Sequence, residues 1–316
     1  MRNTRTFSNK EFDNIIKQNL IAEGISEAVF TYQVDTGRRY ELYYSEAEFQ
    51  KFVEEMKQVY PKHYKKYWGD KEAAENKGGL GGELVPKAGR YGLMPPKMAS
   101  VASSSRFCYL ALRDGTDVLI PNRTLTKDDV EFEKECKIFA ESLAAPQLDA
   151  YIADAVCDIF IEAKCHEIFG SHKAEFRNKY WTRLAQIKEF AGALGEAEKK
   201  KDTFQLPLTL FGISKEKTRF DIKQFTCHLL GIAEANKGKK TKLVYLFFKP
   251  CTDDTVYSQW IEEVFEELKA EINAIFRCRT IADFCEEHNI ELMAIAEESK
   301  VMERLTKDNT INLLDE

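Results

Sequence analysis

The alternation of apolar and polar residues divides the chain into three parts. In residues 1–66 the apolar positions recur with helical spacing, then alternate as in strands, and then recur with helical spacing again. This order predicts a small α+β element of a helix, a β-hairpin and a second helix, at Asn9–Glu23, Ala28–Val34, Tyr40–Tyr44 and Glu46–Tyr60. Residues 67–96 are rich in Gly and Pro and show little periodicity, so we expect a long flexible loop. Regular patterns return in residues 97–316, which we expect to form the main domain.

Residues 97–316 combine helical and strand-like patterns. We expect helices at Lys97–Arg113, Phe176–Leu194, Asp221–Asn236 and Val256–Phe276. We expect strands at Val118–Ile120, Val130–Ile138, Leu148–Ala153, Cys157–Cys165, Leu206–Ile213, Lys242–Phe248 and Ile290–Ala296. A helix, then meandering strands, then helices alternating with buried strands indicate an α/β fold whose mixed central sheet is flanked by helices.

Composition and charge narrow the class of protein. Apolar residues make up 44% of the chain, which fits a globular protein with a buried core. No apolar run approaches the roughly 18 residues of a membrane span, and the first residues lack the apolar stretch of a signal peptide. We therefore expect a cytoplasmic protein with no membrane contact. A net charge of −6 argues against a protein whose whole surface binds nucleic acid, although basic segments at 62–66, 199–201 and 237–242 leave local phosphate contacts open.

The strongest candidate for chemistry is the tripeptide Glu162-Ala163-Lys164. Glu-x-Lys tripeptides are common in this highly charged chain, but this one follows the apolar run 159–161 on a predicted strand. Side chains alternate along a strand, so Glu162 and Lys164 project from the same face. A glutamate and a lysine that leave a hydrophobic strand together are costly unless they are paired or bind something.

Asp149 on the preceding strand completes this group. A two-residue turn at Ala155-Val156 would place Asp149 directly opposite Glu162, with their Cβ atoms roughly 5 Å apart. Two like charges so close destabilise an empty sheet, but they suit a divalent cation. Mg²⁺ prefers carboxylate oxygens and keeps several waters, so Asp149, Glu162 and the carbonyl of Ala163 are candidate ligands, and Mn²⁺ is expected to substitute. The alternative is a surface Asp–Lys–Glu cluster at the edge of the sheet.

This arrangement resembles the PD-(D/E)XK nuclease superfamily, whose signature is an aspartate on one strand and (D/E)-x-K on the next. Asp149 and Glu162-Ala163-Lys164 occupy those positions, while Pro146 lies three residues before the aspartate. The resemblance implies a restriction endonuclease-like core. It also implies a Mg²⁺-dependent nuclease that hydrolyses phosphodiester bonds of DNA, with RNA as the alternative substrate. An activated water, oriented or deprotonated with help from Lys164, would attack the phosphorus.

A second group of residues extends the resemblance to the RecB-like branch of that superfamily. In that branch the glutamine of a Q-x-x-x-Y helix approaches the active site, and a buried strand follows. Gln224 stands at the glutamine position, His228 replaces the tyrosine, and LVYLFF is the strand. The resemblance implies a catalytic role for Gln224. The alternative is that Gln224 and His228 merely share one face of a helix.

Further candidates lie on the predicted first strand and first helix of the main domain. Glu133 or Glu135 would supply an additional acid of the kind that members of the superfamily often carry. Ser104 and Arg106 would contact a phosphate, although a helix start rich in serine also fits plain capping.

Two other functions stay open. A catalytically inactive protein with the same fold would bind nucleic acid or act as a scaffold, and it need not bind Mg²⁺. A zinc-stabilised interaction protein would use the pairs Cys165-His166 and Cys227-His228, although their spacing is not that of a zinc finger. For the nuclease we expect nucleic acid as the partner, with DNA first, and we leave a homo-oligomer or a partner subunit open.

Overall fold

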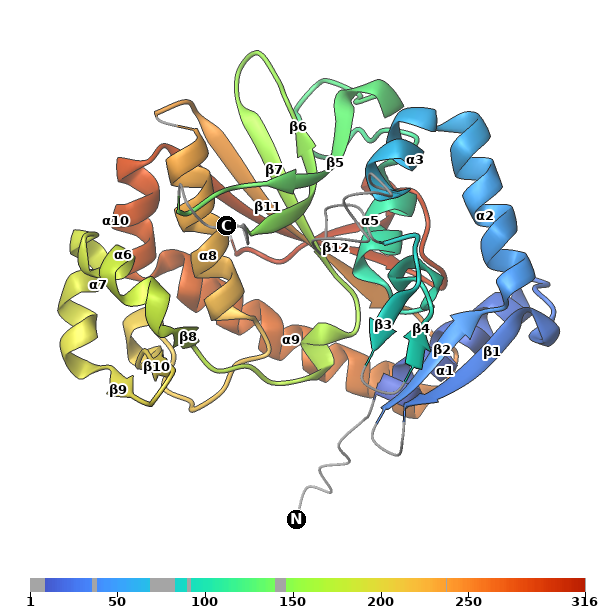
Figure 1. Ribbon diagram of the computed structural model, residues 1–316, viewed down its shortest axis with the longest axis horizontal. Coiled ribbons are helices and arrows are strands. Elements are labelled where there is room, and N and C mark those ends of the chain that lie inside the picture. Colours follow the sequence, from blue (N-terminus) through green and yellow to red (C-terminus); the bar gives the residue numbers. More distant parts are fainter. Residues whose placement is uncertain are drawn as a thin grey trace.

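A six-stranded mixed sheet lies at the centre of the computed structural model (Figure 1). The structure describes residues 9–35, 39–68, 83–89, 92–139, 146–236 and 238–315. The strand order is β13-β12-β11-β7-β6-β5, with bounds Val130–Glu135 (β5), Gln147–Ile152 (β6), Asp158–Lys164 (β7), Thr241–Pro250 (β11), Ile290–Ser299 (β12) and Thr310–Asn312 (β13). β5, β6 and β7 form an antiparallel meander, while β11 runs parallel to both β7 and β12. The predicted α/β class with a mixed sheet flanked by helices is confirmed; the restriction endonuclease-like core stays a prediction.

The two central strands are covered on both faces. β7 is buried at every residue, and β11 is buried at every residue except Lys242, which is half-buried. Strands that meet water on neither face read as continuous apolar runs rather than as alternating patterns. The sequences of β7 and β11 follow this rule except at a few polar positions. Two of these, Glu162 and Lys164, lie at the candidate site. The others, Asp158, Lys242 and Lys249, form ion pairs elsewhere.

Helices pack on both faces of this sheet. They are α5 (Ser104–Leu112), α8 (Ile222–Ala235), α9 (Thr255–Arg277) and α10 (Arg279–Glu287). The ring of Phe107 in α5 lies 5.5 Å from that of Phe248, and the ring of Phe225 in α8 lies 5.8 Å from that of Tyr245. Residues 245 and 248 of one strand point to opposite faces, so α5 and α8 lie on opposite sides of the sheet. Within the ranges described above, no helix is both long enough and apolar enough to cross a membrane.

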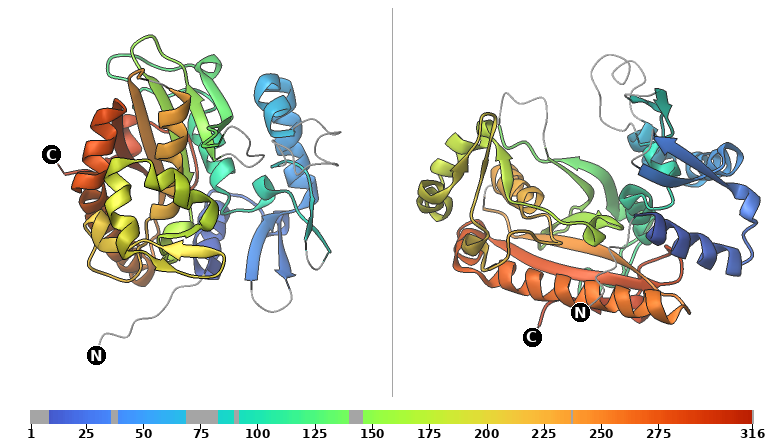
Figure 2. Two further views of the ribbon diagram at one scale, coloured as in Figure 1. Left: turned by 60° about the vertical axis from the view of Figure 1, so that its left-hand side comes forward. Right: turned by 90° about the horizontal axis from the view of Figure 1, so that it is seen from below.

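The N-terminal elements lie at one end of the molecule (Figure 2). They are α1 (Asn9–Ala22), a 3-10 turn (Glu27–Val29), β1 (Phe30–Asp35), β2 (Arg39–Tyr44), α2 (Glu46–Val59) and α3 (Pro61–Trp68). The predicted helix, hairpin and helix are confirmed, and α3 is an additional helix. Phe12 of α1 packs against Phe169 and Phe248, with ring centroids 5.2 and 6.3 Å away. One apolar core therefore extends from Phe12 into the central sheet and on to Leu313.

The segment expected to be a flexible loop contains ordered elements. β3 (Lys87–Gly89) pairs with β4 (Gly92–Met94), and Glu83 and Leu84 are buried. Residues 69–82 and 90–91 lie outside the described residues. The helix predicted at 97–113 is in fact a 3-10 turn (Lys97–Ala99) followed by α5, which begins at Ser104 because the Ser103 hydroxyl accepts a hydrogen bond from the Arg106 amide at 3.2 Å.

Three predictions in the main domain are wrong. The long helix at 176–194 is replaced by β8 (Glu175–Arg177), a 3-10 turn (Asn178–Tyr180), α6 (Trp181–Ala185), α7 (Lys188–Ala191) and a 3-10 helix (Gly192–Glu196). The segment 206–213, predicted as a strand, contains a 3-10 helix (Leu208–Phe211) instead, and two short strands, β9 (Glu198–Lys199) and β10 (Thr203–Gln205), precede it. Residues 118–120 form bends instead of a strand. Stacking of Phe176 on Phe204, with ring centroids 5.6 Å apart, joins β8 to β10 and overrides the helical spacing.

Candidate active site

The β6–β7 hairpin has the register that was predicted. Ala150 pairs with Ile161 and Ile152 pairs with Ile159, so one further step along the ladder places Asp149 opposite Glu162. The connection is longer than the expected two-residue turn, because the last pair is already separated by six residues, 153–158. Backbone pairing of β6 with β7 ends at Ala150 and Ile161. Beyond this pair, Asp149 Oδ2 accepts a hydrogen bond from the Ala163 amide at 2.8 Å.

Glu133 brings a third carboxylate to the same face of the sheet. On β5, Phe132 pairs with Ala150 and Lys134 pairs with Leu148, so Glu133 lies between these pairs and opposite Asp149. Its φ of 55° lies in the left-handed region, which a residue with a Cβ adopts only at a cost in free energy. Three neighbouring strands thus each contribute one buried carboxylate at the same level of the sheet.

These carboxylates line a polar cavity of about 410 Å³. Its wall is formed by Glu83, Lys97, Ser104, Glu133, Gln147, Asp149, Glu162, Lys164, Glu167 and Gln224. Five of the lining side chains are acids and two are lysines. The structure therefore brings together the predicted Asp149, Glu162, Lys164 and Gln224, and adds Glu83, Lys97 and Glu167, which sequence reasoning missed.

Burial and mutual repulsion raise the pKa values of the carboxyl groups of Glu133, Asp149 and Glu162. Burial raises the pKa of Glu133 to about 8, and the Asp149 carboxylate adds to the shift. Burial, followed by repulsion from Glu162, raises the pKa of Asp149 to about 7, and burial raises the pKa of Glu162 as well. Burial lowers the pKa of Lys164, but Glu162, Glu167 and Asp149 outweigh burial, and the net pKa is raised. A divalent cation entering the cavity would relieve the repulsion among the carboxylates.

Glu162 is contacted by side chains from two elements, β7 and α8. Its Oε1 accepts hydrogen bonds from Lys164 Nζ at 2.5 Å and from Gln224 Nε2 at 2.8 Å. His228 Nε2 lies 3.7 Å from Oε2, and His228 Nδ1 lies 3.0 Å from the hydroxyl of Tyr245 on β11. Burial, followed by the charge on Lys164, lowers the pKa of His228 to about 3, so this imidazole is neutral. Gln224 and His228 therefore do more than share a helix face, because both approach Glu162.

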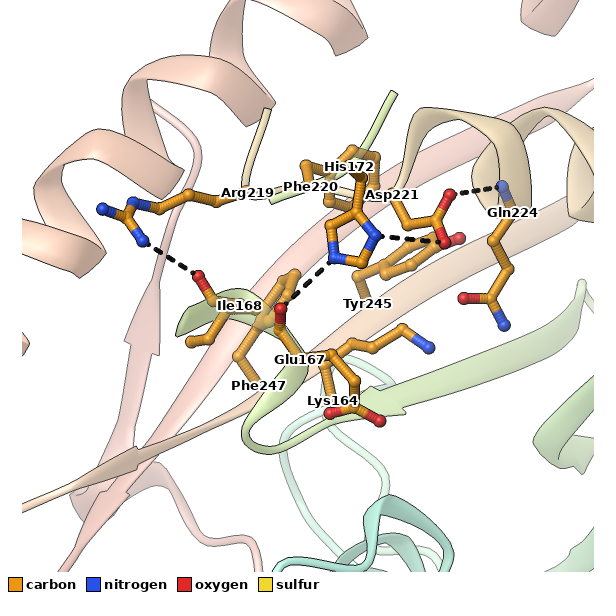
Figure 3. A pocket seen from close by; sticks show the side chains of 10 residues that line it. All are labelled: Lys164, Glu167, Ile168, His172, Arg219, Phe220, Asp221, Gln224, Tyr245 and Phe247. Atoms are coloured by element: carbon orange, nitrogen blue, oxygen red, sulfur yellow. Dashed lines mark hydrogen bonds and ion pairs between the residues drawn. The ribbon is translucent and has the colours of Figure 1, made fainter. Parts of the chain in front are cut away.

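The position of α8 follows from its first residues and from one close approach. Asp221 caps the helix by accepting a hydrogen bond from the Gln224 amide at 2.9 Å (Figure 3). A Cβ at Gly231 would lie 2.6 Å from the Cys136 carbonyl oxygen, so glycine allows the helix to pass close to that backbone. Figure 3 also shows His172 between Asp221 and the Glu167 carbonyl.

Two predicted residues lie away from the cavity. The Arg106 guanidinium is buried over the rings of Tyr44 and Phe52, about 4 Å from each centroid, and donates a hydrogen bond to the Met98 carbonyl. Stacking and this hydrogen bond hold the guanidinium away from the cavity, although its buried Nε has no hydrogen-bond partner among the described residues. Glu135 pairs with Gln147 at the end of β5 and does not line the cavity. Among the candidates for the additional acid and the phosphate contact, Glu133 and Ser104 are the ones that the structure places in the cavity wall.

The donor set fits Mg²⁺ better than zinc. In the described part of the chain, no three His, Cys, Asp or Glu side chains are already arranged to hold a metal ion. Mg²⁺ is nevertheless commonly bound through one or two carboxylates with waters completing the octahedron, and the cavity supplies such carboxylates. The two Cys-His pairs are engaged elsewhere: His166 Nδ1 contacts the Ala102 carbonyl at 3.1 Å, and His228 contacts Tyr245. All eight cysteines are free thiols.

Comparison of the chain with protein-family models, with curated proteins and with solved structures gives no match. The candidate site therefore rests on its own geometry. That geometry is an acidic cavity at the open end of a hairpin, with one lysine and one glutamine hydrogen-bonded to the same carboxylate.

Proposed function

We propose that the protein is a Mg²⁺-dependent nuclease that hydrolyses phosphodiester bonds, with DNA as the first substrate to test and RNA as the second. One observation carries the proposal: the buried side chains of Asp149, Glu162 and Lys164 line one cavity, and Gln224 from another element is hydrogen-bonded to Glu162. A sheet that merely needed stability would not bury three carboxylates side by side, because each raises the cost of ionising the next.

The cation site would be formed by Asp149, Glu162 and the carbonyl of Ala163. Bound Mg²⁺ would activate a water molecule and offset the charge that develops on the phosphate. Gln224 fixes the orientation of Glu162 through its hydrogen bond to Oε1, and the Ala163 amide fixes one oxygen of Asp149. In hydrolysis a water oxygen forms a bond to phosphorus, the P–O ester bond breaks, and the departing oxygen takes up a proton.

Lys164 acts in this proposal as a charged donor and not as a base. The carboxylates around it raise its pKa above the ordinary value, so the ammonium keeps its proton at neutral pH. A protonated lysine next to the reacting phosphate positions the attacking water or a non-bridging oxygen by hydrogen bonding, and it attracts the developing negative charge. Lys164 is at present paired with Glu162 Oε1, and this ion pair would weaken when Glu162 binds the cation.

Each of the three basic segments contains a lysine that is paired with a nearby acid. Lys62 pairs with Asp128 at 3.4 Å, Lys200 pairs with Glu175 at 2.9 Å, and the Lys239–Asp158 pair measures 2.5 Å. These lysines are therefore partly neutralised by local acids. A sequence-independent substrate, recognised by its backbone at the cavity, fits this surface best.

The proposal is tested with purified protein, single- and double-stranded DNA and RNA, and either Mg²⁺ or Mn²⁺. We expect metal-dependent cleavage of at least one substrate, and a loss of about 100-fold or more for Lys164→Ala. Lys134→Ala is the matched control, because Lys134 lies on the same sheet but outside the cavity wall. Absence of cleavage of all four substrates by the wild-type protein contradicts the proposal.

A second candidate is a nucleic-acid-binding or scaffold protein with the same fold and no catalysis. The observation in its favour is that Glu162 is already occupied by Lys164 and Gln224. Titration calorimetry with Mn²⁺ separates the two candidates. The nuclease is expected to bind the cation, with affinity lost in Asp149→Asn; an oligonucleotide-binding protein with no affinity for Mn²⁺ supports the second candidate.

A further inference from the structure

Glu83, Lys97 and Ser104 line the same cavity as the carboxylates of the three strands. Lys97, in the 3-10 turn before α5, donates a hydrogen bond from Nζ to the Ser105 hydroxyl at 3.1 Å. The same ammonium lies 3.4 Å from Glu83 Oε2. About half of the Lys97 side chain is exposed, so its charge can be reached from the cavity. This wall therefore presents a second cation to the space in front of Asp149.

Ser104 adds an uncommitted hydroxyl beside this lysine. Ser104 is 7% exposed and lines the cavity, and its hydroxyl has no hydrogen-bond partner among the described residues. It opens α5, where the Ser103 hydroxyl is already used to cap the Arg106 amide. The first amides of a helix have no acceptor within the helix and carry partial positive charge. An ammonium, a buried hydroxyl and free helical amides are together the donor set that binds a phosphate group.

In the absence of a ligand, Glu83 is the counter-ion of Lys97. Glu83 is 8% exposed, and its Oε2 accepts no hydrogen bond, although Lys97 lies within ion-pair distance. A buried carboxylate oxygen without a donor is costly, so the contact with Lys97 is weaker than a hydrogen-bonded ion pair. A phosphate oxygen that binds Lys97 would replace a poor partner with a better one.

We propose that Lys97, Ser104 and the N-terminus of α5 form a subsite for one phosphate of a nucleic-acid strand, next to the phosphate that is cleaved, and that Glu83 is the counter-ion which this phosphate displaces. The inference rests on the proposed nuclease function, since it places the substrate strand across the cavity from the carboxylates to α5. The acids outnumber the lysines in the cavity, so the strand binds there only together with divalent cations. Lys97 would contact the substrate directly and Glu83 would act as a positioning residue.

The test measures binding of a short fluorescent single-stranded DNA by anisotropy, with Ca²⁺ as the cation, over a series of salt concentrations. We expect Lys97→Ala to weaken binding about tenfold and Ser104→Ala to weaken it about threefold. Glu83→Gln should tighten binding severalfold, because Lys97 then has no competing carboxylate. Lys97→Ala should also reduce the salt slope by about 0.7, the value for one lost phosphate contact on a single strand.

Lys97→Arg and Lys134→Ala are the control variants. Arginine keeps the charge, so binding should return to within about twofold of wild type if charge recognition is the role of Lys97. Thermal unfolding of each variant shows whether the fold is retained. Lys97→Ala and Glu83→Gln variants that are folded but bind DNA with wild-type affinity and wild-type salt slope overturn the subsite, as does a wild-type protein that binds no oligonucleotide.

The outcome for the subsite can be separated from the outcome for the nuclease. Cleavage by the wild-type protein combined with unchanged binding by Lys97→Ala removes the subsite and leaves the nuclease intact. Weakened binding by Lys97→Ala without cleavage supports the subsite and contradicts the nuclease. Inorganic phosphate is the second probe: if it stabilises the protein in a Lys97-dependent way while the oligonucleotide does not bind, the subsite belongs to a free phosphate and the nucleic-acid assignment is wrong.

Discussion

Asp149, a single residue in the cavity, lowers the stability of the folded protein when it is ionised. Burial and the Glu162 carboxylate raise its pKa to about 7 from the ordinary 3.8. A raised folded-state pKa contributes stability that is present below pH 4 and is lost as the pH rises through about 7. Ionised Asp149 therefore destabilises the metal-free protein at pH 8. The Ala163 amide can donate its hydrogen bond to a carboxylate oxygen or to an amide oxygen at position 149.

Asp149→Asn should stabilise the metal-free protein in a pH-dependent way. Its advantage over wild type in the free energy of unfolding should grow by on the order of 2 kcal/mol between pH 5 and pH 8. Urea unfolding in EDTA at the two pH values measures this difference. Mg²⁺ should then stabilise wild type at pH 8 more than the variant, because the cation binds only the folded carboxylate site. An advantage that does not change with pH contradicts the assigned cause.

Glu133 gives a second prediction, which concerns the backbone instead of the charge. In an ordinary strand glycine is less stable than alanine by roughly 0.5–1 kcal/mol. At Glu133 the φ of 55° reverses this order, because alanine keeps the strained Cβ and glycine does not. Both substitutions remove the carboxylate, so comparing them isolates the backbone.

We expect Glu133→Gly to be more stable than Glu133→Ala by about 1 kcal/mol in urea unfolding. Glu131→Gly and Glu131→Ala form the control pair, since Glu131 lies on the same strand and pairs regularly with Tyr151. There alanine should be the more stable of the two. The same order at both positions would mean that position 133 stores no strain.

Among the elements, the β6–β7 hairpin decides whether Asp149 meets Glu162. A one-residue slip would turn every side chain of β6 to the other face, so register is critical here. The connection at 153–157 is long, and Val156 at its tip is 74% exposed. The burial of both strands, and not the loop, therefore sets the register.

Insertion of one glycine between Ala155 and Val156 should consequently be tolerated. We expect a loss of less than about 0.6 kcal/mol in the free energy of unfolding and an unchanged rate of cleavage. A glycine inserted between Ala150 and Tyr151, inside β6, should abolish activity and destabilise the fold severely. If the loop insertion also abolishes activity while the protein remains folded, the loop sets the register after all.

The same hairpin marks what could be predicted from the sequence and what could not. Apolar runs specified which strands are buried, and an assumed two-residue turn placed Asp149 and Glu162 on one face. A turn longer by one residue would have separated them, but the observed connection is longer by an even number of residues and keeps the pairing. Lys97 and Glu83 reach the cavity through a turn and a glycine-rich segment, so no periodicity signals them; the charged lysine between Pro96 and Met98 was the available hint. Tyr245, which contacts His228, could have been suspected from the sequence because it carries the one hydroxyl in LVYLFF. It lies on β11, two strands away from the strand of Asp149.

On the scale of the whole molecule, the N-terminal elements are attached to the sheet by polar as well as apolar contacts. Asn19 of α1 is buried, and its Nδ2 donates hydrogen bonds of 2.7 Å to the carbonyls of both Cys251 and Lys300. These two carbonyls directly follow β11 and β12. One side chain therefore joins residues predicted to form a separate unit, 1–66, to the ends of the two longest strands.

Asn19→Ala should destabilise the entire protein by about 1–3 kcal/mol, because it leaves two carbonyls without their donor. Gln18→Ala, an exposed neighbour on the same helix, should change stability by less than about 0.5 kcal/mol. Far-ultraviolet circular dichroism and tryptophan fluorescence should follow one common transition that moves to lower denaturant in Asn19→Ala. A new early transition, with the main one unmoved, would instead mean that residues 1–66 unfold as an independent domain, since loss of the joint would then leave the sheet unaffected.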